Sequence, residues 1–130
     1  MSTGDTNLSF VDVNCAVGRM RRTAPKTYST PSELTERMNR YGIDAAFVYH
    51  TMSLLYDPWE GNIKLIEELE GYENLYPVWA VLPHHTGEFP APKELLELMH
   101  KHDVRMVRVF PSGENHQFSV AEWNCGLLWS

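Results

Sequence analysis

Within residues 10–18, apolar and polar side chains alternate over residues 11–15, and the stretch ends in a glycine. Alternation of this kind predicts a β-strand with two different faces, followed by a glycine turn. Asp12 and Asn14 lie on one parity and are expected to point toward the carboxyl end of a parallel sheet, where α/β proteins build their sites. The other parity is wholly apolar and is expected to pack under helices; it consists of Val11, Val13, Cys15 and Val17.

Three further apolar runs predict three further strands, over residues 44–50, 76–82 and 104–110. A helix signal separates each strand from the next. Capping residues or prolines predict helix starts near Thr30, Asp57, Pro92 and Ser119. Gly42 and Gly71 are expected to end the first two helices.

The predicted strands start near residues 10, 44, 76 and 104, at intervals of 34, 32 and 28 residues. One helix in each interval makes this a βα repeat, which gives parallel strands with right-handed crossovers. Four units in 130 residues are half of a TIM (β/α)8 barrel, which takes about 250 residues. We therefore expect residues 1–130 to form a partial α/β domain, the N-terminal half of such a barrel, whose last helix is cut short at Ser130. A small doubly wound sheet with helices on both faces is the alternative.

Composition narrows the class of function. Hydrophobic residues make up 43% of the chain and charged residues 22%, which is ordinary for a soluble globular domain. The net charge is −6 and the basic cluster at Arg19, Arg21 and Arg22 is short, so no nucleic-acid partner is expected. The sequence shows no signal segment and no apolar run of membrane-spanning length. Cys15 and Cys125 lack metal-type spacing and fit reduced thiols in a cytoplasmic protein, although a disulfide between them stays open.

Candidate chemistry rests on polar residues at the carboxyl ends of the predicted strands. Motifs for phosphate loops, dinucleotide binding, zinc hydrolases and serine elbows are absent from the sequence. In a closed barrel the candidates would converge at its mouth; they are Asp12, Asn14, His50, His84, His85, Arg108 and His116. The alternation in residues 104–110 places Arg108 in the mouth, Val107 and Val109 under helices, and Arg105 in solvent at the far end.

Each candidate also has a purely structural interpretation. Asp12 could satisfy neighbouring backbone groups, and His50 could cap a strand end within a hydrogen-bond network. Adjacent residues point apart, so at most one of His84 and His85 can face a site. Arg108 could form an ion pair with Asp12 across the barrel interior.

The order of these motifs resembles the amidohydrolase-related TIM-barrel proteins. The segments that carry the resemblance are FVDVNCAVG, TPSELTERMNRYGIDAAFV, YPVWAVLP, VRMVRVFP and HQFSVAEWNCGLL. They cover the first four βα units of that family's barrel, and its enzymes hydrolyse or decarboxylate small substrates with a divalent metal. The family's first strand carries Asp-x-His-x-His, and aligned on Asp12 the two metal-binding histidine positions hold Asn14 and Ala16 here. We therefore expect no cofactor, and no tightly bound zinc-type ion at this strand.

The candidate residues and the resemblance suggest two alternative functions. The first is hydrolysis of a small polar or carboxylate substrate: His50 or His84 would move protons, and the substrate would be held by Asp12, Asn14, Arg108 and His116. The second is a non-catalytic barrel fragment that binds a ligand or a partner chain, which the missing strand-one histidines favour. In either case the open edges of a half barrel predict a homo-oligomer, or association with a C-terminal half.

Overall fold

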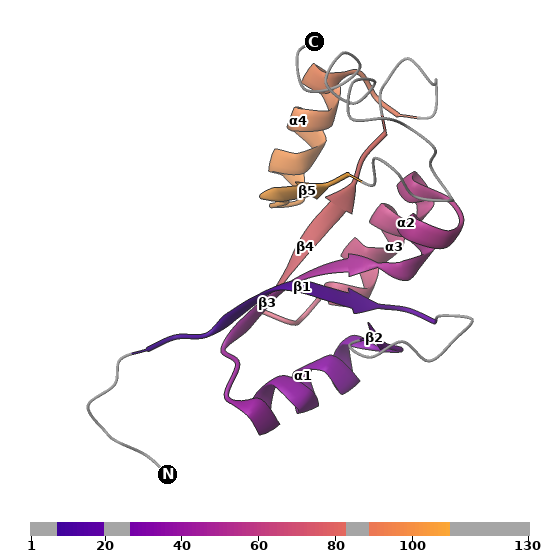
Figure 1. Ribbon diagram of the computed structural model, residues 1–130. Helices are drawn as coiled ribbons and strands as arrows, with labels where there is room; N and C mark the ends of the chain where they lie inside the picture. The colour runs from indigo at the N-terminus through magenta and orange to yellow at the C-terminus, as the bar shows by residue number, and fades with distance from the viewer. Residues whose placement is uncertain (1–7, 20–26, 83–88, 110–130) are drawn as a thin grey trace.

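The computed structural model describes residues 8–19, 27–82 and 89–109. Within these residues the chain forms a parallel sheet flanked by helices (Figure 1). The order of the strands across the sheet is β2-β1-β3-β4-β5, and each adjacent pair is parallel. The strands are β1 (Val11–Val17), β2 (Thr27–Tyr28), β3 (Ala45–His50), β4 (Leu75–Ala80) and β5 (Met106–Arg108). The four predicted strands are thus confirmed, and β2 is an addition.

The helices of the described residues are α1 (Pro31–Tyr41), α2 (Thr51–Leu55), α3 (Pro58–Leu69) and α4 (Pro92–Lys101). The three longer ones begin where the sequence places start signals, and the start predicted near Ser119 lies outside the described residues. Thr30 caps α1 by accepting a hydrogen bond from the Glu33 backbone N–H at 3.3 Å, and Gly42 ends it at φ 68°. Asp57 caps α3 in the same way. The short helix α2 has no predicted start, because five residues carry no readable helical period.

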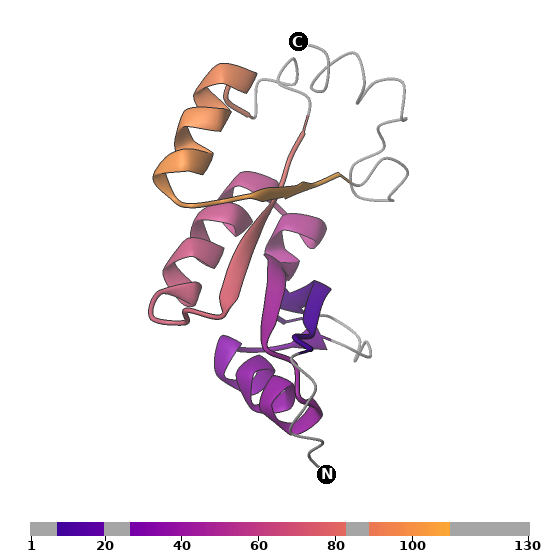
Figure 2. The same ribbon diagram turned by 90° about the vertical axis from the view of Figure 1, so that its left-hand side faces the viewer.

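The three longer helices lie on one face of the sheet. After β1 the short β2 pairs on one side of β1, and the chain then advances in the other direction through β3 and β4 to β5, with a helix before each of these three strands. Right-handed crossovers that advance in one direction leave their helices on the same side. Figure 2 shows α1, α3 and α4 stacked along one side of the strands. The opposite side, which we call the open face, carries none of these helices, so the arrangement differs from the doubly wound alternative.

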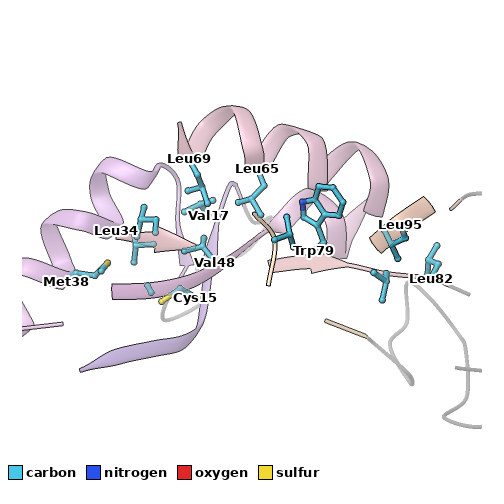
Figure 3. Packing of buried hydrophobic residues seen from close by; sticks show 14 of the residues in the cluster. Cys15, Val17, Leu34, Met38, Val48, Leu65, Leu69, Trp79, Leu82 and Leu95 are labelled. Atoms are coloured by element: carbon cyan, nitrogen blue, oxygen red, sulfur yellow. The ribbon is translucent and has the colours of Figure 1, made fainter. Parts of the chain in front are cut away.

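The hydrophobic core fills the space between the sheet and these helices (Figure 3). Val17 and Val48 from the strands meet Leu34 of α1 and Leu65 of α3, and all four are buried. Trp79 of β4 is fully buried and packs edge-on against Trp59 of α3, with ring centroids 5.3 Å apart. None of the helices that the structure describes is both long and apolar enough to span a membrane.

A buried asparagine joins α3 to the end of β4. The Asn62 side chain donates to the Ala80 carbonyl at 2.7 Å and accepts from the Ala80 N–H at 2.9 Å. Both residues are almost completely buried. The amide thus acts as a strand neighbour and satisfies backbone groups that would otherwise be buried without partners.

A bulge divides β1 and overturns part of the expected alternation. Asp12 is paired with Ala46 but Cys15 with Val48, so Val13 and Asn14 together stand opposite Phe47. The Asn14 N–H is bound by the Asp12 carboxylate at 2.9 Å, which holds the extra residue in place.

The bulge explains which apolar residues of β1 reach the core. Cys15 and Val17 are buried as expected, but Val11 and Val13 are 48% and 60% exposed. The expectation that all four apolar residues pack under helices is therefore wrong for the first two. The extra residue shifts the parity of the strand in the middle, so its two halves do not share one apolar face.

Candidate functional site

A polar cluster on the open face joins the two strands that lie furthest apart among β1, β3, β4 and β5. Arg108 of β5 donates from Nη1 to the Oδ1 atom of Asn14 on β1, at 2.5 Å. Its guanidinium carbon also lies 4.5 Å from the ring centroid of Tyr49 on β3, within cation–π distance. The three residues form one group, which we call the Arg108 cluster.

The register of the sheet explains why these side chains share a face. Tyr49 is paired with Ala16, two residues from Asn14, and Arg108 is paired with Ala80. Paired residues in adjacent strands point to the same side, so small alanines lie beside the long side chains and leave room for them. Ala16 and Ala80 therefore leave space on the open face for the side chains of Tyr49 and Arg108.

The contact between Arg108 and Asn14 requires a curved sheet. β3 and β4 lie between their strands, and three strand spacings in a flat sheet span roughly 14 Å. An arginine side chain is too short for that span. The sheet therefore twists and curves toward the open face, which becomes concave around the Arg108 cluster.

The predicted direction of Arg108 is confirmed, whereas the register separates it from Asp12, the partner considered in the structural interpretation. Val107 is paired with Trp79 on the helix-covered side, and Val109 packs against the core, although Val107 stays 38% exposed. Arg105 forms a solvent-exposed ion pair with Asp103, as expected for the far end of the strand. The arginine contacts Asn14 rather than Asp12, because the bulge puts Asn14 on the open face and pairs Asp12 with Ala46 of the other face. Asp12 instead binds the backbone of Asn14.

His50 lies on the helix-covered face, so the expectation that it would join the barrel mouth is wrong. It shares the parity of Ala46 and Val48, and like them it is buried. Its Nδ1 atom accepts the Met52 N–H at 3.0 Å and caps α2. The alternative interpretation, a histidine that caps the strand end, is the one the structure supports.

The surroundings of His50 fix its protonation. Because Nδ1 accepts a hydrogen bond, the neutral ring carries its proton on Nε2, which faces Glu68 of α3 at 3.3 Å. Burial lowers the pKa of the imidazole below its ordinary value of 6.5, the Glu68 carboxylate opposes this, and the Lys64 ammonium adds to it. His50 is therefore neutral at pH 7, and its one acceptor nitrogen is occupied by the helix cap. These features make it a poor general base.

Three predicted histidines remain to be considered, and two contact residues, Tyr49 and Glu68, were not predicted. His84, His85 and His116 lie outside the residues that the structure describes. Tyr49 was missed, although it shares the parity of Phe47 and could have been found as an aromatic residue near a strand end. Glu68 was also missed, and no sequence signal marks it, because its contact depends on how α3 docks on the sheet.

Comparisons with known proteins do not identify the chain: no family model, no curated protein and no solved structure matches it.

Proposed function

We propose that this chain is the N-terminal part of an amidohydrolase-like TIM-barrel sheet, and that its open face binds the anionic group of a small polar or carboxylate ligand through Arg108. The barrel-type part of the proposal is supported by strands that advance in one direction, by helices on one face, and by the curvature around the Arg108 cluster. The sequence resemblance to the amidohydrolase-related proteins points the same way.

The observation that carries the ligand proposal is the contact between Arg108 and Asn14. The guanidinium is held between an amide oxygen and an aromatic face, at the carboxyl end of the sheet. An amide is a neutral acceptor, and the contact with Asn14 orients the guanidinium on the open face. A carboxylate can bind the planar fork of an arginine through two parallel hydrogen bonds.

The strand-one residues do not fit the divalent metal of the resembling family. The register puts Ala16 and Asn14 on the open face, where alanine offers no ligand atom and the Asn14 oxygen already accepts from a cation. A metal ion at that oxygen would be repelled by Arg108. Among the described residues, no group of three or more histidines, cysteines or carboxylates is placed to hold an ion.

The geometry favours the binding function over hydrolysis. His50, one of the two proposed proton carriers, lies on the other face, and its acceptor nitrogen is engaged. Asp12 is paired with Ala46, whose side chain lies on the helix-covered side. Two of the residues assigned to catalysis or substrate binding are thus separated from Arg108 by the sheet itself.

Calorimetric titration of the full chain with succinate tests this function. We expect saturable binding that is weakened at least tenfold in Arg108→Gln. Arg105→Gln is the matched control, because it removes an exposed arginine of the same segment whose side chain pairs with Asp103. Equal affinity for succinate in the Arg108→Gln variant and in the native chain would refute the proposal.

A further inference from the structure

A cavity lies on the helix-covered side, at the carboxyl ends of β1 and β3. Its volume is about 280 Å³, just below the range of roughly 300–1,000 Å³ of most ligand pockets, which suits a small molecule. Gly18 and Arg19 at its rim follow β1, His50 and Thr51 lie at the end of β3 and the start of α2, and Lys64 and Glu68 lie on α3.

The loop after β1 is fitted closely to this cavity. Gly18 has a φ of +111°, and a Cβ atom there would lie 2.2 Å from the Thr51 hydroxyl oxygen and 2.9 Å from the His50 ring. The Thr51 hydroxyl donates to the Arg19 carbonyl at 3.1 Å. Glycine is thus required for the approach, and the contact holds the backbone of Arg19 at the rim.

Two buried polar atoms at the cavity lack hydrogen-bond partners among the described residues. They are Nε2 of His50 and Oε2 of Glu68. The atoms are 3.3 Å apart, but their geometry is not that of a hydrogen bond, so the contact is mainly electrostatic. A buried donor and a buried acceptor that do not satisfy each other are costly, and a group that serves both would offset this cost.

A hydroxyl group has the chemistry to bridge this pair. It can accept from the Nε2–H of His50 and donate to the Glu68 carboxylate at the same time. The cations Lys64 and Arg19 line the same cavity and favour a negative charge on the rest of the ligand. A hydroxyl and an anionic group on one small molecule would therefore satisfy both parts of the lining.

We propose that this cavity is a second binding site, for a small hydroxy-carboxylate whose hydroxyl bridges His50 and Glu68 and whose carboxylate faces Lys64 and Arg19. The site is separate from the Arg108 cluster, because His50 and Arg108 lie on opposite faces of the sheet. It does not depend on the ligand proposed for the open face.

Titration of the full chain with three probes tests the second site. Lactate has both groups, propionate lacks the hydroxyl, and ethylene glycol lacks the carboxylate. We expect lactate to bind at least tenfold more tightly than either of the others, and to shift the Nε2–H nuclear magnetic resonance of His50.

Matched variants separate the contributions of the lining. Glu68→Leu should abolish the preference for lactate over propionate, whereas Glu67→Leu, the neighbouring exposed position of α3, should keep it. Lys64→Met should weaken both carboxylates at least fivefold, and Lys93→Met on α4 should not. Arg108 would bind the carboxylates of lactate and propionate alike, so the preference for lactate reports on this cavity, and failure of the open-face site would not affect it.

Two outcomes would overturn the proposal: equal binding of propionate and lactate by the native chain, or native affinity for lactate in Lys64→Met. The probe comparison on the native chain decides the matter alone if a cavity variant does not fold.

Discussion

Arg108 on β5 donates a hydrogen bond to Asn14 on β1, 94 residues earlier in the chain and three strands away in the sheet. This contact links the fold to the proposed function. It requires the sheet to curve toward the open face, and it orients a cation at the carboxyl ends of the strands, where parallel α/β sheets bind ligands.

The charge at position 14 should control anion binding on the open face. In Asn14→Asp the new carboxylate would pair with Arg108 and compete with an added anion. We expect the affinity for succinate to fall about tenfold, equivalent to about 1.4 kcal/mol. Asn14→Ala removes the neutral acceptor without adding a charge and should bind at least as well as the native chain, so calorimetry that finds equal weakening in both variants would contradict the assigned role of Arg108.

Stability should fall as the pH is lowered, through His50. Burial and Lys64 lower its pKa in the folded state, against the opposing effect of Glu68, so the unfolded chain binds the proton more readily. The stabilising contribution of neutral His50 is therefore complete above the unfolded pKa of about 6.5 and is lost as the pH falls below it toward the lowered folded value.

The variant His50→Asn isolates this effect, because asparagine can cap α2 and does not titrate. Urea denaturation between pH 7 and pH 5 should show a smaller loss of unfolding free energy in the variant than in the native chain. Identical pH dependence in the two proteins would show that His50 is not the titrating group.

Asn62 should be among the most sensitive positions for stability. Asn62→Ala leaves the buried N–H and carbonyl of Ala80 without the two hydrogen bonds that the side chain provides. Each such group costs about 1–3 kcal/mol, so we expect a loss of about 3 kcal/mol in the free energy of unfolding. Asn39→Ala, an exposed change on α1, is the control in denaturant melts, and a loss below about 1 kcal/mol for Asn62→Ala would contradict this account.

The alternating patterns predicted the strands, the parallel order and the direction of Arg108, because these depend on local period and on the repeat length. They did not predict the bulge in β1. An aspartate that binds the backbone two residues later is compatible with both a regular strand and a bulge, and only the pairing with β3 decides between them. Asp12 and His50 were both predicted on the face that carries Arg108, and both lie on the helix-covered face. Asp12 does so because it precedes the bulge and pairs with Ala46, and His50 does so because it shares the parity of Ala46 and Val48 in β3.

Self-association is expected from the surface that the sheet leaves uncovered. β2 and β5 are the outer strands of the described sheet, and Leu8, Phe10, Val11 and Val13 are between 48% and 70% exposed. Exposed apolar strands of this kind pair with other chains. Sedimentation at micromolar concentration should show dimers or larger species, and a single monodisperse monomer with a cooperative thermal transition would count against it.

The most direct test of the central claim follows the Asn14 side-chain amide and the Arg108 guanidinium together by nuclear magnetic resonance. The account predicts a nuclear Overhauser effect between the two groups in the ligand-free chain, and a saturable shift of both on addition of succinate. The absence of that effect, together with signals that do not respond to succinate, would contradict both the curved open face and its role in binding anions.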